Sequence, residues 1–137
     1  MSFPKIGNLA PDFMLSDQMG KSVKLSEYRD NKAVVLYFYP KAMTPGCTVQ
    51  AAGIRDSKQW ISKNKVVVLG VSPDSPDRLA RFDDKENLKF TLLSDKDHKV
   101  AEKYGAWGLK KFMGREYDGT HRTTFVIDEQ GVIEQVI

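Results

Sequence analysis

The chain has 137 residues, of which 41% are hydrophobic and 28% charged, a composition that favours one globular domain over residues 1–137 and argues against long-range disorder. Its net charge of +3 does not by itself indicate a nucleic-acid partner, and its one cysteine, Cys47, excludes an intramolecular disulfide and a zinc site built from several thiolates. No apolar run approaches the roughly 18 residues of a membrane span, and the first nine residues lack a signal-peptide pattern, so we expect a cytoplasmic protein with no membrane partner.

The first elements expected along the chain are short. Alternating residues predict strands at 13–15 and 22–25, on either side of a turn at 17–20. Ser26 follows the second strand and is expected to cap a short helical turn.

A longer strand and a helix come next. Ala33 to Tyr39 form a continuous apolar, β-branched and aromatic run, which is typical of a strand covered on both faces, and the run stops at Pro40. Thr44 is a good N-cap and the following proline suits the first helical position. We therefore predict a helix over residues 45–62.

The alternation of strand and helix then continues. Residues 66–71 and 90–93 are predicted as buried strands, and Ser75 opens the helix between them. Asp97 is expected to cap a further helix that ends at Gly105.

The last expected element is a hairpin. It joins strands at 123–127 and 132–137 through the turn Asp128-Glu129-Gln130-Gly131. The whole order predicts a layered α/β fold in which helices flank a central, partly parallel sheet.

Cys47 is placed by these predictions in the first turn of a helix, just beyond the carboxyl end of a strand. Unpaired backbone N–H groups and the positive end of the helix dipole favour a negatively charged thiolate there, and the thiolate is the nucleophilic form of cysteine. The alternative is that Cys47 is only a small buried hydrophobic residue. A lone cysteine by itself favours the second interpretation, and the Thr44-Pro45-Gly46 context makes the two evenly matched.

The segment Pro40-Lys41-Ala42-Met43-Thr44-Pro45-Gly46-Cys47 resembles the Pro-x-x-x-Thr-x-x-Cys signature of peroxiredoxins. The resemblance is greatest to the bacterioferritin comigratory protein (Bcp/PrxQ) group and covers essentially the whole chain. It includes the segments Ala10-Pro11-Asp12-Phe13, Leu92-Leu93-Ser94-Asp95, Tyr104-Gly105-Ala106-Trp107-Gly108 and His121-Arg122-Thr123-Thr124-Phe125.

The resemblance implies a thioredoxin-like fold and a thiol-dependent peroxidase of antioxidant defence that needs no metal or organic cofactor. Cys47 matches the peroxidatic cysteine, which attacks hydrogen peroxide or an organic hydroperoxide and becomes a sulfenic acid. Thr44 matches the residue whose hydroxyl binds the peroxide. Arg122 matches the arginine that stabilises the thiolate and the breaking O–O bond, and Pro40 matches the proline that shields the pocket from water.

Each of these residues also has a simpler interpretation. Thr44 can serve only as a helix cap, Arg122 as an exposed charge before a strand, and Pro40 as a strand terminator. His121 is interpreted as structural, not as a general base.

The chain departs from the family at two places. Ala52 stands where many members carry a resolving cysteine, and residues 75–87 contain no cysteine either, so an external thiol such as thioredoxin, glutaredoxin or glutathione must complete the cycle. Ala52 is either natural or an engineered replacement. The family also adds a C-terminal helix, whereas this sequence stops at Ile137.

Two other functions fit parts of the sequence. Lys103, Lys110, Lys111 and Arg115 interleave with Tyr104, Trp107, Phe112 and Tyr117, as cations and aromatic rings do in single-strand binding proteins. Nearby acidic residues dilute this charge, so no nucleic-acid partner is expected. The remaining alternative is a catalytically silent thioredoxin-fold module that binds a partner; in either case we expect a monomer.

Overall fold

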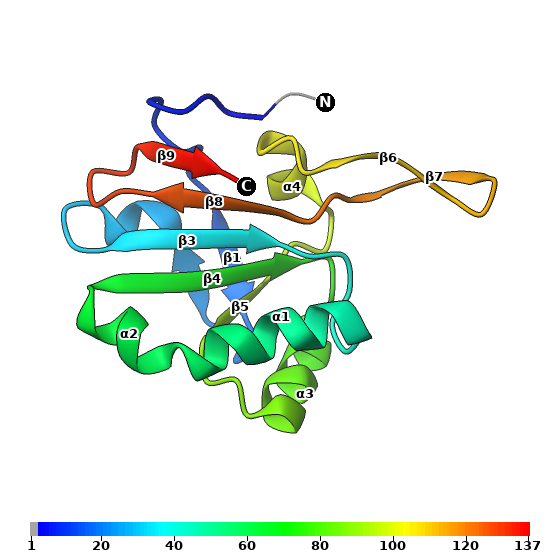
Figure 1. Cartoon of the computed structure of the whole chain (residues 1–137), viewed down its shortest axis with the longest axis horizontal. Helices are drawn as coiled ribbons and strands as arrows, with labels where there is room; N and C mark the ends of the chain where they lie inside the picture. The colour runs from blue at the N-terminus through cyan, green and yellow to red at the C-terminus, as the bar shows by residue number, and fades with distance from the viewer. Residues whose placement is uncertain (1–2) are drawn as a thin grey trace.

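A seven-stranded mixed sheet forms the centre of the fold (Figure 1). The computed structural model describes residues 3–137, apart from the side chains of Lys58, Ser62 and Phe112. In their order across the sheet, the strands are β2 (Ser22–Lys24), β1 (Met14–Asp17), β5 (Thr91–Ser94), β4 (Val66–Ser72), β3 (Ala33–Phe38), β8 (Thr123–Ile127) and β9 (Ile133–Val136).

The three middle strands β3, β4 and β5 run parallel, and the other pairs are antiparallel. Leu36 of β3 lies opposite Leu69 of β4, which in turn pairs with Thr91 of β5. This confirms the strands predicted from the two long apolar runs and the partly parallel sheet. Because crossover connections bring helices onto both faces of such a sheet, its central strands are apolar on both faces.

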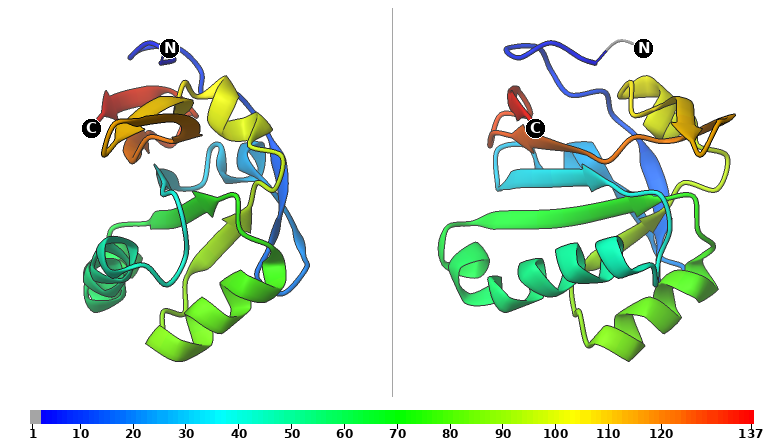
Figure 2. Two further views of the ribbon diagram at one scale, coloured as in Figure 1. Left: turned by 90° about the vertical axis from the view of Figure 1, so that its right-hand side faces the viewer. Right: turned by 45° about the vertical axis from the view of Figure 1, so that its right-hand side comes forward.

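Helices cover the two faces of the sheet (Figures 1 and 2). The core is accordingly divided into two clusters, and successive residues of β3 alternate between them: Leu36 and Phe38 belong to one, Tyr37 and Tyr39 to the other. The cluster with the tyrosines packs under α1 (Pro45–Asp56) and α3 (Pro76–Glu86), and the other lies under the 3-10 helix η1 (Leu25–Tyr28) and α4 (Lys99–Lys103).

The helix expected over residues 45–62 is interrupted, so the prediction of one continuous helix was wrong. A break at Ser57 separates α1 from a second helix, α2 (Lys58–Lys63). The Ser57 hydroxyl donates to the Gly53 carbonyl at 3.0 Å, and the Ser57 N–H bonds to the Ile54 carbonyl, three residues back. A serine that bonds back to the preceding turn bends a helix, which accounts for the break.

Two expected caps are also corrected. The carboxylate at the start of α4 is Asp95, not Asp97: it accepts from the N–H groups of Val100 and Ala101 at 3.2 and 2.9 Å, and His98 occupies the N-cap position. At η1 the cap position belongs to Lys24, not Ser26, and the Ser26 N–H donates to Asp12. In both cases a carboxylate upstream of the predicted residue reaches the free N–H groups.

A hairpin that is absent from the predictions is formed by β6 (Trp107–Phe112) and β7 (Arg115–Thr120). It extends away from the rest of the molecule in Figure 1. Met113 and Gly114 form its turn with φ angles of 51° and 78°, the two positive values that a tight hairpin turn requires. Methionine is an uncommon residue for such a turn, so the sequence carries no strong hairpin signal there.

The hairpin predicted at 123–127 and 132–137 is confirmed as β8 and β9, which end the described chain at the edge of the sheet. Its turn is closed by a hydrogen bond from the Gly131 N–H to the Asp128 carbonyl at 3.0 Å. Among the helices of residues 3–137, none combines the length and the apolar composition that a membrane span requires.

Candidate functional site

Cys47 is the third residue of α1, as the sequence predicted. Thr44 occupies the N-cap position with an extended backbone, φ −83° and ψ 155°, and Pro45 is the first helical residue. The sulfur therefore belongs to a helical turn whose backbone N–H groups have no partner within the helix, so the positive end of the helix dipole favours a negative charge there.

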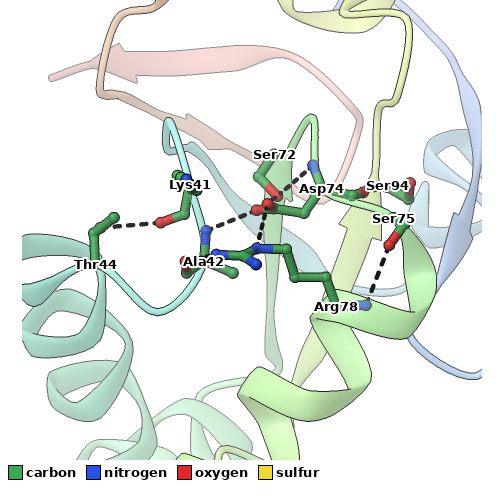
Figure 3. A network of polar contacts seen from close by, with 8 residues as sticks. All are labelled: Lys41, Ala42, Thr44, Ser72, Asp74, Ser75, Arg78 and Ser94. Carbon is green, nitrogen blue, oxygen red and sulfur yellow. Dashed lines mark hydrogen bonds and ion pairs between the residues drawn. The ribbon is translucent and has the colours of Figure 1, made fainter.

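The Thr44 side chain does not cap this helix. Its hydroxyl instead donates to the Lys41 carbonyl at 3.0 Å, within the loop that leads into α1 (Figure 3). The predicted cap position is thus confirmed, but the predicted use of the side chain as a cap is wrong. The lone pairs of the hydroxyl oxygen are left to accept a hydrogen bond from another molecule.

Cys47 is only 2% exposed and packs in the core cluster that contains Tyr37, Tyr39 and Ala51. Burial of this kind is what a purely hydrophobic cysteine also shows. The two interpretations are therefore separated by the polar groups that reach the sulfur.

Arg122 is the group that reaches the sulfur. It lies in the link between β7 and β8, and its Nη2 donates to Cys47 Sγ at 3.3 Å. A permanently charged donor at this distance stabilises a thiolate much more than a thiol. The structure thus brings together Cys47 and Arg122, which are 75 positions apart in sequence.

Gln50 is a site residue that the sequence analysis missed. Its Oε1 accepts from Arg122 Nη1 at 2.7 Å, so the two ends of the guanidinium are held by Gln50 and Cys47. Because residues three apart share one helix face, the i+3 spacing from Cys47 was a signal that could have identified it.

Gly46 makes room for this arrangement. A Cβ atom at Gly46 would lie 3.3 Å from Arg122 Nη2, closer than most side-chain contacts. The glycine in the first turn of α1 therefore lets the guanidinium approach the helix.

Tyr37 and Tyr39 form a neutral aromatic wall beside the cysteine. Their rings are stacked with centroids 5.3 Å apart, and burial raises the pKa of both phenols above the ordinary value. A negative charge on Cys47 raises both pKa values further. From the sequence, Tyr37 and Tyr39 were predicted as part of a buried strand, with no role beside the cysteine.

The other predicted residues lie less close to the sulfur. Pro40 is half-buried at the bend after β3, and none of the contacts described for residues 3–137 joins it or the Thr44 hydroxyl to Cys47. The His121 N–H donates to the Ala106 carbonyl at 2.7 Å, while His98 stacks on Trp107 with ring centroids 3.8 Å apart. The described residues contain no group of three or more metal-binding side chains.

The segment considered for nucleic-acid binding uses several of its groups internally. Lys110 donates to the Thr120 carbonyl at 2.9 Å, and Lys111 lies 3.5 Å from the Glu116 carboxylate. Tyr104 is fully buried and Trp107 is stacked on His98, while the Phe112 side chain lies outside the described residues.

A groove of about 220 Å³ lies away from the cysteine, toward the carboxyl end of α1. Its lining includes Ile54, Ile61, Val67, Leu88 and Phe90. Cys47 and Arg122 are not part of this lining, so the candidate site is a closely packed contact and not the floor of this groove.

Comparison with known proteins identifies relatives along almost the whole chain. The model of the AhpC/TSA family matches residues 6–136. Peroxiredoxin Bcp of Escherichia coli strain K12 is 55% identical over 132 residues, which are 96% of this chain and 84% of that protein.

Two solved structures are also similar. BcpB of Mycobacterium tuberculosis has a TM-score of 0.85 at 36% identity and covers 97% of this chain and 84% of its own. A mutant of PrxQ from Xylella fastidiosa has a TM-score of 0.91 at 28% identity, covering 99% of this chain and 86% of its own.

Proposed function

The chain belongs to the AhpC/TSA family, in its Bcp/PrxQ group of peroxiredoxins, and from this premise we propose that its thiol peroxidase reaction takes place at Cys47. Membership of this group makes it a thiol-dependent peroxidase with a thioredoxin-like fold. The observation that carries the proposal is the Arg122 guanidinium, which donates to the buried Cys47 sulfur at 3.3 Å in the first turn of α1.

The reaction begins with the Cys47 thiolate. Its sulfur attacks one oxygen of the peroxide, an S–O bond forms as the O–O bond breaks, and the displaced oxygen leaves with a proton as water or an alcohol. The sulfur is oxidised to a sulfenic acid and the peroxide is reduced. Negative charge moves from sulfur to oxygen in this step, so fixed donors along that path lower its barrier.

Arg122 supplies this fixed positive charge. Its Nη2 contacts the sulfur, and Gln50 holds Nη1, so the guanidinium keeps its orientation while charge moves from the sulfur to the oxygens. Gln50 bonds to Arg122 and acts through it as a positioning residue.

Thr44 orients the peroxide. Because its hydroxyl proton is donated to the Lys41 carbonyl, the Thr44 oxygen is left to accept a hydrogen bond from the O–H of a hydroperoxide. Pro40, at the bend after β3, limits the access of water to the same place. Hydrogen peroxide and organic hydroperoxides both carry the O–H group that this arrangement needs. The related bacterioferritin comigratory protein of Xanthomonas campestris has alkyl peroxide reduction activity.

The second half of the cycle needs a thiol from another molecule, because Cys47 is the only cysteine of the sequence and Ala52 occupies the place of a resolving one. The thiol condenses with the sulfenic acid, water leaves, and a mixed disulfide forms; a further thiol then releases reduced Cys47. Thioredoxin, glutaredoxin and glutathione are the reductants proposed. Such a cycle suits a monomer in the cytoplasm, where thiols are kept reduced.

A peroxidase assay with each of these reductants tests the proposal. We expect peroxide consumption by the wild type with at least one of them, and none above the uncatalysed rate by Cys47→Ser. Peroxide consumption that persists in Cys47→Ser would place the reaction elsewhere. A wild type that consumes no peroxide with any reductant, and whose Cys47 reacts slowly with alkylating agents at neutral pH, would favour the silent binding module.

A further inference from the structure

A buried carboxylate lies outside the residues assigned to the reaction. Asp74 follows β4 and precedes α3, and its side chain is 7% exposed. Its Oδ2 accepts from the Ser72 hydroxyl at 2.8 Å and from the Ala42 N–H at 2.7 Å, and its Oδ1 forms an ion pair with Arg78 Nε at 3.1 Å (Figure 3). A buried charge is tolerated when it is compensated in this way.

Asp74 is itself fixed to the sheet. Its N–H donates to the Ser72 hydroxyl at 3.3 Å, and its carbonyl accepts from the Ser94 hydroxyl at 2.6 Å. Ser72 and Ser94 are the last residues of β4 and β5, two parallel neighbours. The carboxylate is therefore a rigid point at the carboxyl edge of the sheet.

The peptide of Ala42 is held from both sides by the same pair of residues. Its N–H donates to Asp74, and its carbonyl accepts from Arg78 Nη2 at 3.3 Å. Ala42 is fully buried, in the loop between β3 and α1. The guanidinium of Arg78 thus reaches the carboxylate of Asp74 and the carbonyl of Ala42 at the same time.

The backbone next to Ala42 adopts a strained conformation. Met43 has a φ of 65°, in the left-handed region that costs residues with a side chain roughly 1–2 kcal/mol. Thr44 follows directly, and Cys47 lies three residues further on in α1. Strain of this kind persists where the surrounding contacts impose it, and the contacts next to it are those of Ala42.

We propose that Asp74 and Arg78 are positioning residues for peroxide reduction: by clamping the Ala42 peptide they fix the turn at Met43 and the start of α1 at Thr44, and so place Cys47 against Arg122. The inference rests on the proposed function of Cys47. Among the described residues, no hydrogen bond joins Asp74 or Arg78 to the sulfur, so they act through the backbone of the loop and not on the reacting atoms.

The same clamp keeps the sulfur covered. Cys47 is 2% exposed, and the loop that carries Ala42 and Met43 packs in the same cluster. Releasing the Ala42 peptide has two opposite consequences. Peroxide reduction slows because Cys47 and Arg122 are no longer held against each other, whereas a bulkier reagent gains access to the thiol.

The variants Arg78→Gln, Arg78→Lys and Asp74→Asn test the clamp. Lysine keeps the charge but lacks the planar fork through which Nε and Nη2 of Arg78 serve Asp74 and the Ala42 carbonyl from fixed positions. Asparagine has only one acceptor oxygen, which cannot face the donors on both sides. The matched controls are Arg81→Gln and Asp77→Asn, which make the same charge changes at exposed positions of α3.

Two rates are measured for each protein: oxidation of Cys47 by hydrogen peroxide, and its alkylation by iodoacetamide. We expect oxidation to fall about tenfold or more in Arg78→Gln and Asp74→Asn, because small displacements of reacting groups are costly. Alkylation should become faster in the same variants, and Arg78→Lys should lie between them and the wild type. The controls should keep both rates within about twofold of the wild type, as exposed substitutions generally do.

Three other outcomes would refute the clamp or the proposed function. Oxidation at the control rate in Arg78→Gln and Asp74→Asn refutes the clamp and leaves the proposed function intact. A parallel loss of oxidation and alkylation also refutes it, because a general loss of thiolate reactivity would then be the cause. A wild type whose Cys47 is not oxidised by peroxide refutes the proposed function, and the clamp with it. Should Asp74→Asn not fold, the two Arg78 variants decide the question, since that side chain is 37% exposed.

Discussion

The loop before α1 and the β6–β7 hairpin are held in place in different ways. The loop is bound by groups from distant parts of the chain: Asp74 and Arg78 hold Ala42 across 32 and 36 positions, and Arg122 reaches Cys47 across 75. The hairpin pairs mainly with itself, through the ladder between β6 and β7.

This difference indicates where chemistry can be fixed in the molecule. Contacts from several elements set the position of a group in all directions, whereas a two-stranded hairpin on its own is only marginally stable in water. Substitutions around the loop are therefore expected to change the reaction rate. Substitutions in the hairpin should change stability slightly and leave the rate unaffected.

The largest effect is expected for Arg122→Lys. A lysine keeps the positive charge but lacks the planar fork whose two nitrogens bind Gln50 and Cys47, so the donor loses its fixed orientation. We expect oxidation of Cys47 by peroxide to slow about 100-fold, comparable to the loss of one fixed donor in other enzymes. Rapid-mixing kinetics of the reduced protein measure this rate. An unchanged rate would show that charge alone suffices.

A smaller effect is expected for Gly46→Ala. The added methyl group would lie 3.3 Å from Arg122 Nη2 and displace the guanidinium, so we expect oxidation to slow by roughly three- to tenfold. Gly53→Ala is the matched control on the same helix, because nothing lies within 4 Å of its added methyl group. That control should raise the free energy of unfolding by roughly 0.5–1 kcal/mol and leave oxidation unchanged. Equal oxidation rates in both variants would argue against the close approach of Arg122 to Gly46.

The smallest effect is expected in the hairpin, for Met113→Asn. Asparagine tolerates the positive φ of 51° at this turn better than methionine does. The free energy of unfolding should rise by about 0.5 kcal/mol, a fraction of the cost of the left-handed conformation. Urea denaturation measures this change, and the oxidation rate of Cys47 should stay at the wild-type value. A marked loss of oxidation would mean that the hairpin takes part in the site.

Elements of the fold that depend on local signals could be predicted from the sequence, and those that depend on other contacts could not. β3 and the start of α1 were predictable because an apolar run and a Thr-Pro pair are local signals. The break at Ser57 and the cap by Asp95 were missed because each depends on a side chain choosing one of several nearby backbone groups. The β6–β7 hairpin was missed because Met113 lacks the usual turn signal.

The site was predictable to a similar extent. The resemblance pointed to Cys47 and Arg122. Gln50 was not predicted, although it lies three residues after Cys47 and therefore on the same helix face. Nothing in the sequence connects Asp74 and Arg78 with Ala42, because that contact exists only after β3 and β4 have paired and α3 has packed on the sheet.

The most direct measurement is mass spectrometry of the reduced protein after one equivalent of hydrogen peroxide, with a sulfenic-acid trapping reagent present. We expect the reagent to be attached to Cys47, Arg122→Lys to be trapped far more slowly, and Cys47→Ser not to be trapped. A wild-type protein that leaves the peroxide unreacted and carries no modification at Cys47 would contradict the assignment of the reaction to this residue.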